Sequence, residues 1–123
     1  MEKGGVVIVV DDDDAIRELL PIFLGQYFKE VLVFEKPEDA IACMEDLEGQ
    51  PTVVLTDMEM PPYTDGITFI KKMMGECPCP LLLGMSGNGH GPEALEAGAK
   101  AFFQKPMPYD KLAAAIAREA GII

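Results

Sequence analysis

VVLTDMEMPP, residues 53–62, joins an apolar run to a carboxylate and then to a pair of prolines. A continuous apolar, β-branched run of this kind is typical of a strand buried on both faces of a sheet. The prolines stiffen the loop that follows, so the strand should hold Asp57 at the mouth of the sheet. We predict that Asp57 is a nucleophile that takes up phosphate. This chemistry requires a metal site, a cation and a hydroxyl from the rest of the chain.

Apolar runs of the same kind recur along the sequence and alternate with helical patterns. They predict strands at residues 6–10, 31–34, 52–56, 81–85 and 101–104. Apolar residues at three- and four-residue spacing predict amphipathic helices at residues 14–27, 37–47, 67–74, 92–97 and 109–119. Buried strands joined by helices indicate an α/β fold, a five-stranded parallel sheet with helices on both faces. We expect residues 1–123 to form a single domain.

The composition excludes several classes of function. A net charge of −11 repels phosphate backbones and anionic lipids, so we expect no direct nucleic-acid binding and no membrane binding. The apolar run at residues 6–10 is too short to span a bilayer, and no signal-peptide pattern precedes it. Three cysteines without the spacing of a secreted scaffold indicate reduced thiols. We therefore expect a cytoplasmic protein with a divalent cation or a basic partner.

Distinctive polar residues stand directly after four of the predicted strands. They are Asp11 and Asp12, Asp57, Ser86, and Lys105. The carboxyl ends of parallel strands lie along one edge of a sheet, and ligands bind outside that edge. We therefore expect residues from distant parts of the sequence to meet in one cleft.

The residue types in this cleft predict phosphoryl chemistry on a metal ion. Three carboxylates repel each other unless a cation lies among them, and oxygen ligands favour Mg²⁺ (or Mn²⁺). Without the metal, we expect crowding to raise the pKa of at least one carboxylate. Lys105 can pair with one phosphoryl oxygen and Ser86 can donate a hydrogen bond to another.

These residues, in this order and at this spacing, resemble the receiver domain of two-component response regulators, the CheY-like family, over essentially the whole chain. The resemblance implies a flavodoxin/CheY-like three-layer sandwich with strand order 2-1-3-4-5. It implies that Asp57 is the phosphoacceptor and that the backbone carbonyl of Glu59 joins Asp11, Asp12 and Asp57 as a metal ligand. It also implies a cis Lys105–Pro106 bond. Ser86 and Phe102 would be the switch residues.

The function implied by the resemblance is a phosphoacceptor signalling switch in a two-component or phosphorelay system. A histidine kinase or histidine phosphotransfer protein would supply the phosphoryl group. A downstream effector would read the face formed by residues 92–97, 101–104 and 109–119, which is also the expected site of a weak homodimer. Such a domain promotes its own phosphorylation and dephosphorylation but is not a turnover enzyme.

The sequence departs from the family pattern in three places. The loop that starts at Pro61, PPYTDG, is one residue longer than usual. Gly87 follows Ser86 where the family often has alanine. The segment before residues 92–97 is short and rich in glycine, which predicts a poorly ordered helix start.

Two other functions fit parts of the sequence. Asp11 and Asp13 have the D-x-D spacing of a haloacid-dehalogenase-type phosphatase, but Ala15 stands where that family needs threonine or valine, and the chain leaves no room for a cap insertion. A pseudo-receiver that binds partners without phosphorylation is the other alternative, and the intact set of site residues argues against it. Cys77, Cys79 and His90 lack a fourth soft ligand, so loop and packing roles are expected for them.

Overall fold

The computed structural model describes residues 2–47, 51–59, 66–75 and 81–123. Strands and helices alternate along the whole chain. The strands are β1 (Gly4–Val10), β2 (Phe28–Phe34), β3 (Val53–Asp57), β4 (Leu82–Ser86) and β5 (Ala101–Gln104). The helices are α1 (Asp14–Leu24), α2 (Pro37–Asp46), α3 (Gly66–Gly75), α4 (Gly91–Ala97) and α5 (Tyr109–Glu119).

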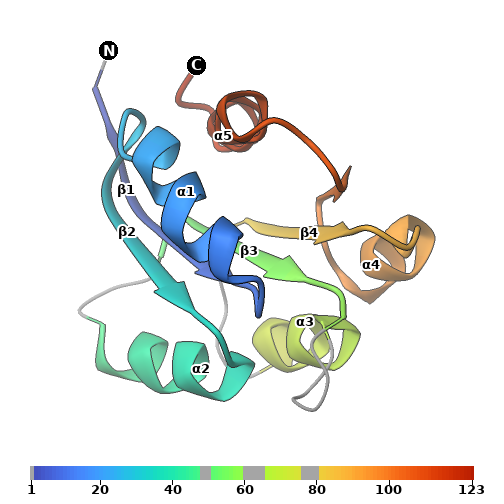
Figure 1. Cartoon of the computed structure of the whole chain (residues 1–123). Helices are drawn as coiled ribbons and strands as arrows, with labels where there is room; N and C mark the ends of the chain where they lie inside the picture. The colour runs from blue at the N-terminus through green and yellow to red at the C-terminus, as the bar shows by residue number, and fades with distance from the viewer. Residues whose placement is uncertain (1, 48–50, 60–65, 76–80) are drawn as a thin grey trace.

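The strands form one parallel sheet with the order β2-β1-β3-β4-β5. Helices α1 and α5 cover one face, and α2, α3 and α4 cover the other (Figure 1). The predicted fold class and strand order are therefore confirmed. Strand β3 lies at the centre, where Leu55 pairs with Val9 on one side and Leu83 on the other. Asp57, at its carboxyl end, stands in the middle of the sheet edge.

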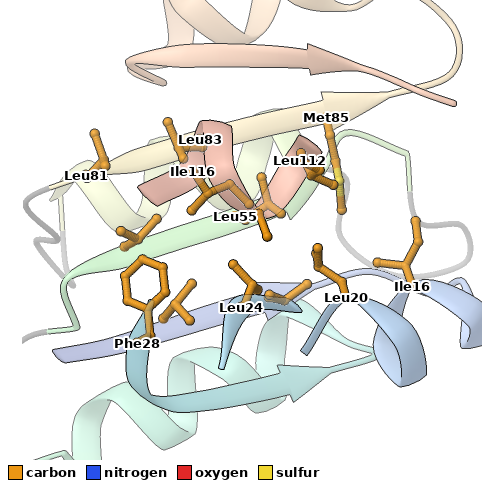
Figure 2. Packing of buried hydrophobic residues seen from close by; sticks show 14 residues of the cluster. Ile16, Leu20, Leu24, Phe28, Leu55, Leu81, Leu83, Met85, Leu112 and Ile116 are labelled. Carbon is orange, nitrogen blue, oxygen red and sulfur yellow. The ribbon is translucent and has the colours of Figure 1, made fainter. Parts of the chain in front are cut away.

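Strand residues point alternately into two hydrophobic clusters. Val7 and Val9 belong to the cluster under α1 and α5, whereas Ile8 and Val10 belong to the cluster under α2, α3 and α4. Figure 2 shows side chains from α1 and α5 meeting those of the central strands. Because both faces are covered, β3 and β4 are buried along their full length, which is why their sequences are apolar runs rather than alternating patterns.

The first helix and second strand differ from the predicted ranges. Apolar spacing predicted a helix to Tyr27, but α1 ends at Leu24, with Gly25 at its C-cap. Strand β2 begins at Phe28 rather than Val31, because Phe28 pairs with Gly4 and is buried. Pairing with β1 therefore adds Phe28 to the strand, although the apolar spacing in the sequence assigned Phe28 to neither the helix nor the strand.

Some sequence features lie outside the described residues, namely the long loop from Pro61 to Asp65 and the cysteines Cys77 and Cys79. Within the described ranges, every helix is too short or too polar to cross a membrane.

Candidate phosphorylation and metal site

Three carboxylates meet at the carboxyl edge of the sheet. Carboxylate oxygens of Asp11, Asp12 and Asp57 lie within 4.8 Å of one another. Asp11 follows β1 and Asp57 ends β3, and these strands are neighbours with Val10 opposite Thr56. Asp11 is fully buried and Asp57 is 5% exposed. In the part of the chain that the structure describes, this is the only group of three acidic, histidine or cysteine side chains placed to share one ion.

The four consecutive aspartates have different roles. The Asp11 carboxylate accepts a hydrogen bond of 2.9 Å from the Asp13 N–H, which fixes its orientation in the cleft. Asp13 is the N-cap of α1, where its side chain accepts a hydrogen bond from the Ala15 N–H. Asp14 lies in the first turn of α1 and pairs with Arg17. Asp13 and Asp14 thus serve the start of the helix.

Lys105 brings a cation into the same cleft from the end of β5. Its Nζ lies 2.8 Å from Asp11 Oδ2 and 3.5 Å from Asp57 Oδ1. The backbone N–H of Lys105 donates to the Ser86 carbonyl at 2.9 Å, so the ends of β4 and β5 are held side by side. The Lys105–Pro106 peptide bond is cis, as the resemblance implies.

Burial is the main reason why the acidic groups have shifted pKa values. Burial, followed by the charge of Asp11, raises the pKa of Asp57 to about 6, although Lys105 and the Glu59 N–H act in the opposite direction. Burial also raises the pKa of Asp11, against the hydrogen bond from Lys105. The sequence predicted a raised carboxylate pKa from crowding, but desolvation comes first and the neighbouring charge second.

Burial lowers the pKa of the Lys105 ammonium, but its hydrogen bond to Asp11 and the negative charges around it outweigh this effect and the pKa is raised. The ammonium is therefore held in its charged form. One such cation shared between two buried carboxylates leaves the cleft with unbalanced negative charge. Three carboxylates without nitrogen or sulfur ligands fit Mg²⁺ or Mn²⁺.

Ser86 and Phe102 lie on the α3/α4 side of the sheet. Ser86 ends β4, is 1% exposed, and its Oγ accepts a hydrogen bond of 3.0 Å from the Asn88 N–H. Phe102 packs against the cluster under α2, α3 and α4. A Cβ atom added to Gly91 would lie 3.1 Å from the Phe102 ring, so the first residue of α4 touches this aromatic side chain directly.

The structure reveals one polar group that sequence reasoning missed. The Asn88 amide donates to Glu59 Oε2 at 2.7 Å, and His90 Nε2 contacts Glu59 Oε1. These hydrogen bonds, the Asn88 bond first, lower the pKa of Glu59. The resemblance implied a role for the backbone carbonyl of Glu59 alone, and His90 was expected to have a loop or packing role. The contacts join residues 29 and 31 positions apart, and no local pattern signals them.

The fold and the place of the acidic cluster put the chain among the doubly wound α/β proteins whose sites lie at the carboxyl ends of the strands. The sequence model of the response regulator receiver domain matches residues 7–117. The chain belongs to this family.

The chain is similar to parts of longer proteins. The transcriptional regulatory protein FixJ of Bradyrhizobium diazoefficiens is 37% identical over 121 residues, which cover 94% of this chain and 57% of FixJ. A protein-glutamate methylesterase/protein-glutamine glutaminase of Rhodopseudomonas palustris is 36% identical over 81% of this chain and 28% of its own length. The crystal structure of full-length FixJ from B. japonicum superposes with a TM-score of 0.78 at 32% identity and covers 97% of this chain and 60% of that one. The chain thus spans less than two thirds of each relative.

Proposed function

We propose that residues 1–123 form one receiver domain, in which Asp57 takes a phosphoryl group from the phosphohistidine of a histidine kinase or histidine phosphotransfer protein. Receiver domains are the phosphoacceptor signalling domains of two-component systems, and this chain is one. The observation that carries the residue assignment is the meeting of Asp57 with Asp11, Asp12 and the Lys105 ammonium at one sheet edge.

In the proposed transfer, a bond forms between phosphorus and an Asp57 carboxylate oxygen while the phosphorus–nitrogen bond of the donor breaks. The electron pair of the broken bond stays on the donor imidazole. Lys105 pairs with one phosphoryl oxygen, and the Ser86 hydroxyl donates a hydrogen bond to another. Burial of Asp11, Asp57 and Ser86 favours this chemistry, because electrostatic interactions are stronger in a low-dielectric environment than in water.

The acidic cluster is the proposed metal site. Asp11, Asp12 and Asp57 would hold Mg²⁺ (or Mn²⁺) through carboxylate oxygens, together with the backbone carbonyl of Glu59. When bound, the ion supplies positive charge to offset the oxygens of the incoming phosphoryl group. The raised pKa values of Asp11 and Asp57 support this assignment, because burial disfavours their charged forms and Lys105 alone does not offset this effect.

The proposed output is a change in the face formed by α4, β5 and α5. A movement of Ser86 toward the phosphoryl group would shift the segment before α4. The Phe102 side chain, which lies against Gly91 at the start of α4, would then change its position. An effector protein or domain would read this face, and a weak homodimer through it is part of the proposal. The chain itself is proposed to be a switch without turnover activity. The cytoplasmic location expected from the cysteines stays a prediction.

The alternative functions are not favoured. The family match covers residues 7–117, so the residues with the D-x-D spacing lie inside the receiver domain. Asp13, the second acid of the D-x-D spacing, is exposed and caps α1 instead of joining the acidic cluster. A pseudo-receiver is not favoured because Asp57 and Lys105 retain contact geometry suited to a phosphoryl group.

The test is titration of the chain with beryllofluoride, an acyl-phosphate mimic, in the presence of Mg²⁺. The amide signals of Ser86 and Phe102 should shift in the wild-type NMR spectrum and stay unchanged in Asp57→Asn. Acetyl phosphate should likewise add one phosphoryl group to the wild type, visible as a mass increase. An equal response in Asp57→Asn would show that the phosphoacceptor is another residue.

A further inference from the structure

The Glu59 side chain joins two loops at the mouth of the site, and the proposed phosphotransfer does not use it. We call the side chains of Glu59, Asn88 and His90 the Glu59 clamp. One carboxylate oxygen of Glu59 accepts from the Asn88 amide at 2.7 Å, and the other contacts His90 Nε2. Glu59 lies two residues after β3, whereas Asn88 and His90 lie between β4 and α4. The clamp therefore connects the segment after the phosphoacceptor strand to the segment before α4.

The clamp reaches both Ser86 and the start of α4. The N–H of Asn88 donates to Ser86 Oγ at 3.0 Å, so the residue held by Glu59 also binds the proposed switch hydroxyl. His90 is the N-cap residue of α4, and its carbonyl accepts a hydrogen bond of 3.0 Å from the Ala94 N–H. A displacement of Ser86 toward Asp57 thus strains the clamp, the N-cap of α4, or both.

Helix α4 itself offers little resistance to such a displacement. It has seven residues, of which only Gly91 and Ala94 are buried. Gly91 has no side chain and Ala94 has only a methyl group, so their burial contributes little hydrophobic free energy to holding α4 on the sheet. The clamp therefore adds side-chain contacts to the backbone hydrogen bonds that fix the segment from Ser86 to His90.

We propose that the Glu59 clamp is a latch that holds the β4–α4 segment in its unphosphorylated position and opens when Ser86 binds the phosphoryl group. This inference rests on the proposed function. A contact that is present in only one of two states shifts the equilibrium toward that state. Glu59, Asn88 and His90 are positioning residues in this view, and weakening the clamp favours the phosphorylated conformation.

The experiment measures the dissociation constant of beryllofluoride, with Mg²⁺ in excess, for the wild type, Asn88→Ala and His90→Ala. Both variants should bind roughly two- to fivefold more tightly, because the clamp contacts are partly exposed and individually weak. Glu96→Ala, on α4 and outside the clamp, is the control and should bind as the wild type does.

The sign of the His90→Ala effect separates the latch from simple electrostatics. Removing His90 leaves the negative Glu59 carboxylate without its His90 partner, close to the bound anion. Repulsion between the carboxylate and the anion would by itself weaken anion binding. Tighter binding therefore supports the latch, and weaker or unchanged binding overturns it.

A double-mutant cycle provides the second readout. If His90 acts through Glu59, His90→Ala should change the dissociation constant in the wild type and have no effect in a Glu59→Ala background. Equal effects in both backgrounds would overturn the proposal. If Asp57→Asn abolishes beryllofluoride binding but the effects of His90→Ala and Glu59→Ala are additive, only the latch is refuted. Wild-type binding that survives Asp57→Asn would refute the proposed function and the latch together.

Discussion

The two helical layers that cover the sheet are built from different side chains. The cluster under α1 and α5 consists mostly of branched aliphatic residues, such as Leu20, Leu24 and Ile116, which point toward the same interior space in Figure 2. The cluster under α2, α3 and α4 contains Ala40, Ala94 and Ala99 together with Met58 and Met73.

This difference assigns separate tasks to the two layers. Branched residues in fixed rotamers pack to a unique arrangement, whereas methionine adapts to altered surroundings and alanine holds a helix only weakly. Ser86, Phe102 and the Glu59 clamp all lie toward the α3/α4 side. We infer that the α1/α5 layer holds the sheet together, while the opposite layer allows the movements that signalling needs.

The strongest test of this comparison is Leu20→Ala in the middle of α1. Leu20 is fully buried, so the substitution removes packing and leaves a cavity that should lower the free energy of unfolding by about 3 kcal/mol. Urea unfolding measures this loss. Leu19→Ala is the control, because Leu19 is 41% exposed and should lose less than about 1 kcal/mol. Similar losses in the two variants would contradict the assigned role of this layer.

Asp57→Asn tests the sheet edge between the layers. The Asp57 pKa rises from 3.8 to about 6 on folding, so the unfolded chain releases this proton more readily, and the wild type loses stability as pH rises through this window. The loss approaches about 3 kcal/mol above pH 6, since each pKa unit corresponds to about 1.4 kcal/mol. Asparagine does not titrate, so without Mg²⁺ the variant should be the more stable protein at pH 7.5.

Thermal melting from pH 4 to 8 measures this pH dependence. Millimolar Mg²⁺ should raise the melting temperature of the wild type far more than that of Asp57→Asn. Asp110→Asn removes an exposed carboxylate at the start of α5 and should keep the wild-type response. A wild-type melting temperature indifferent to both pH and Mg²⁺ would argue against a metal site.

A smaller effect than that of Leu20→Ala is expected for Gly66→Ala, where α3 begins beside the site. An added Cβ would lie 2.4 Å from the Asp57 carbonyl oxygen and 2.6 Å from Met58 Cα, and backbone atoms cannot move aside cheaply. We expect a loss of about 2 kcal/mol together with weaker beryllofluoride binding. Gly75→Ala at the other end of α3 meets no atom within 4 Å and should be neutral or slightly stabilising. Equal behaviour of the two variants would remove the link between α3 and the site.

Much of this architecture follows from local patterns in the sequence. Buried strands read as apolar runs, and the acidic and basic residues of the cleft stand directly at strand ends, which a parallel sheet brings together. The boundary between α1 and β2 was wrong because helical spacing continues to Tyr27, whereas Gly25 ends the helix and pairing with β1 starts the strand. The local sequence does not show which residues of a neighbouring strand will pair with the residues before a predicted strand.

The Glu59 clamp could not be predicted for a related reason. Glu59 and His90 meet because β3 and β4 are adjacent in a particular register, with Asp57 opposite Met85. The side chains that extend beyond these strands then have to adopt matching rotamers. Neither the register nor the rotamers leave a periodic signal in the sequence. Burial is the leading cause of the raised Asp57 pKa, and it could not be predicted from the sequence either, because it depends on how the sheet and helices pack around Asp57.

The contact between Lys105 and Asp11 spans 94 positions, and this has a consequence for the chain during its synthesis. Asp11 and Asp57 leave the ribosome well before Lys105, so β1 and β3 can pair while the ammonium that partly offsets their carboxylates has yet to emerge. Such a partial sheet carries buried negative charge without its internal cation and lacks the neighbours that β4 and β5 provide. The nascent chain therefore brings the Lys105 ammonium to the acidic cluster only after β5, the last strand of the sheet along the chain, has been translated.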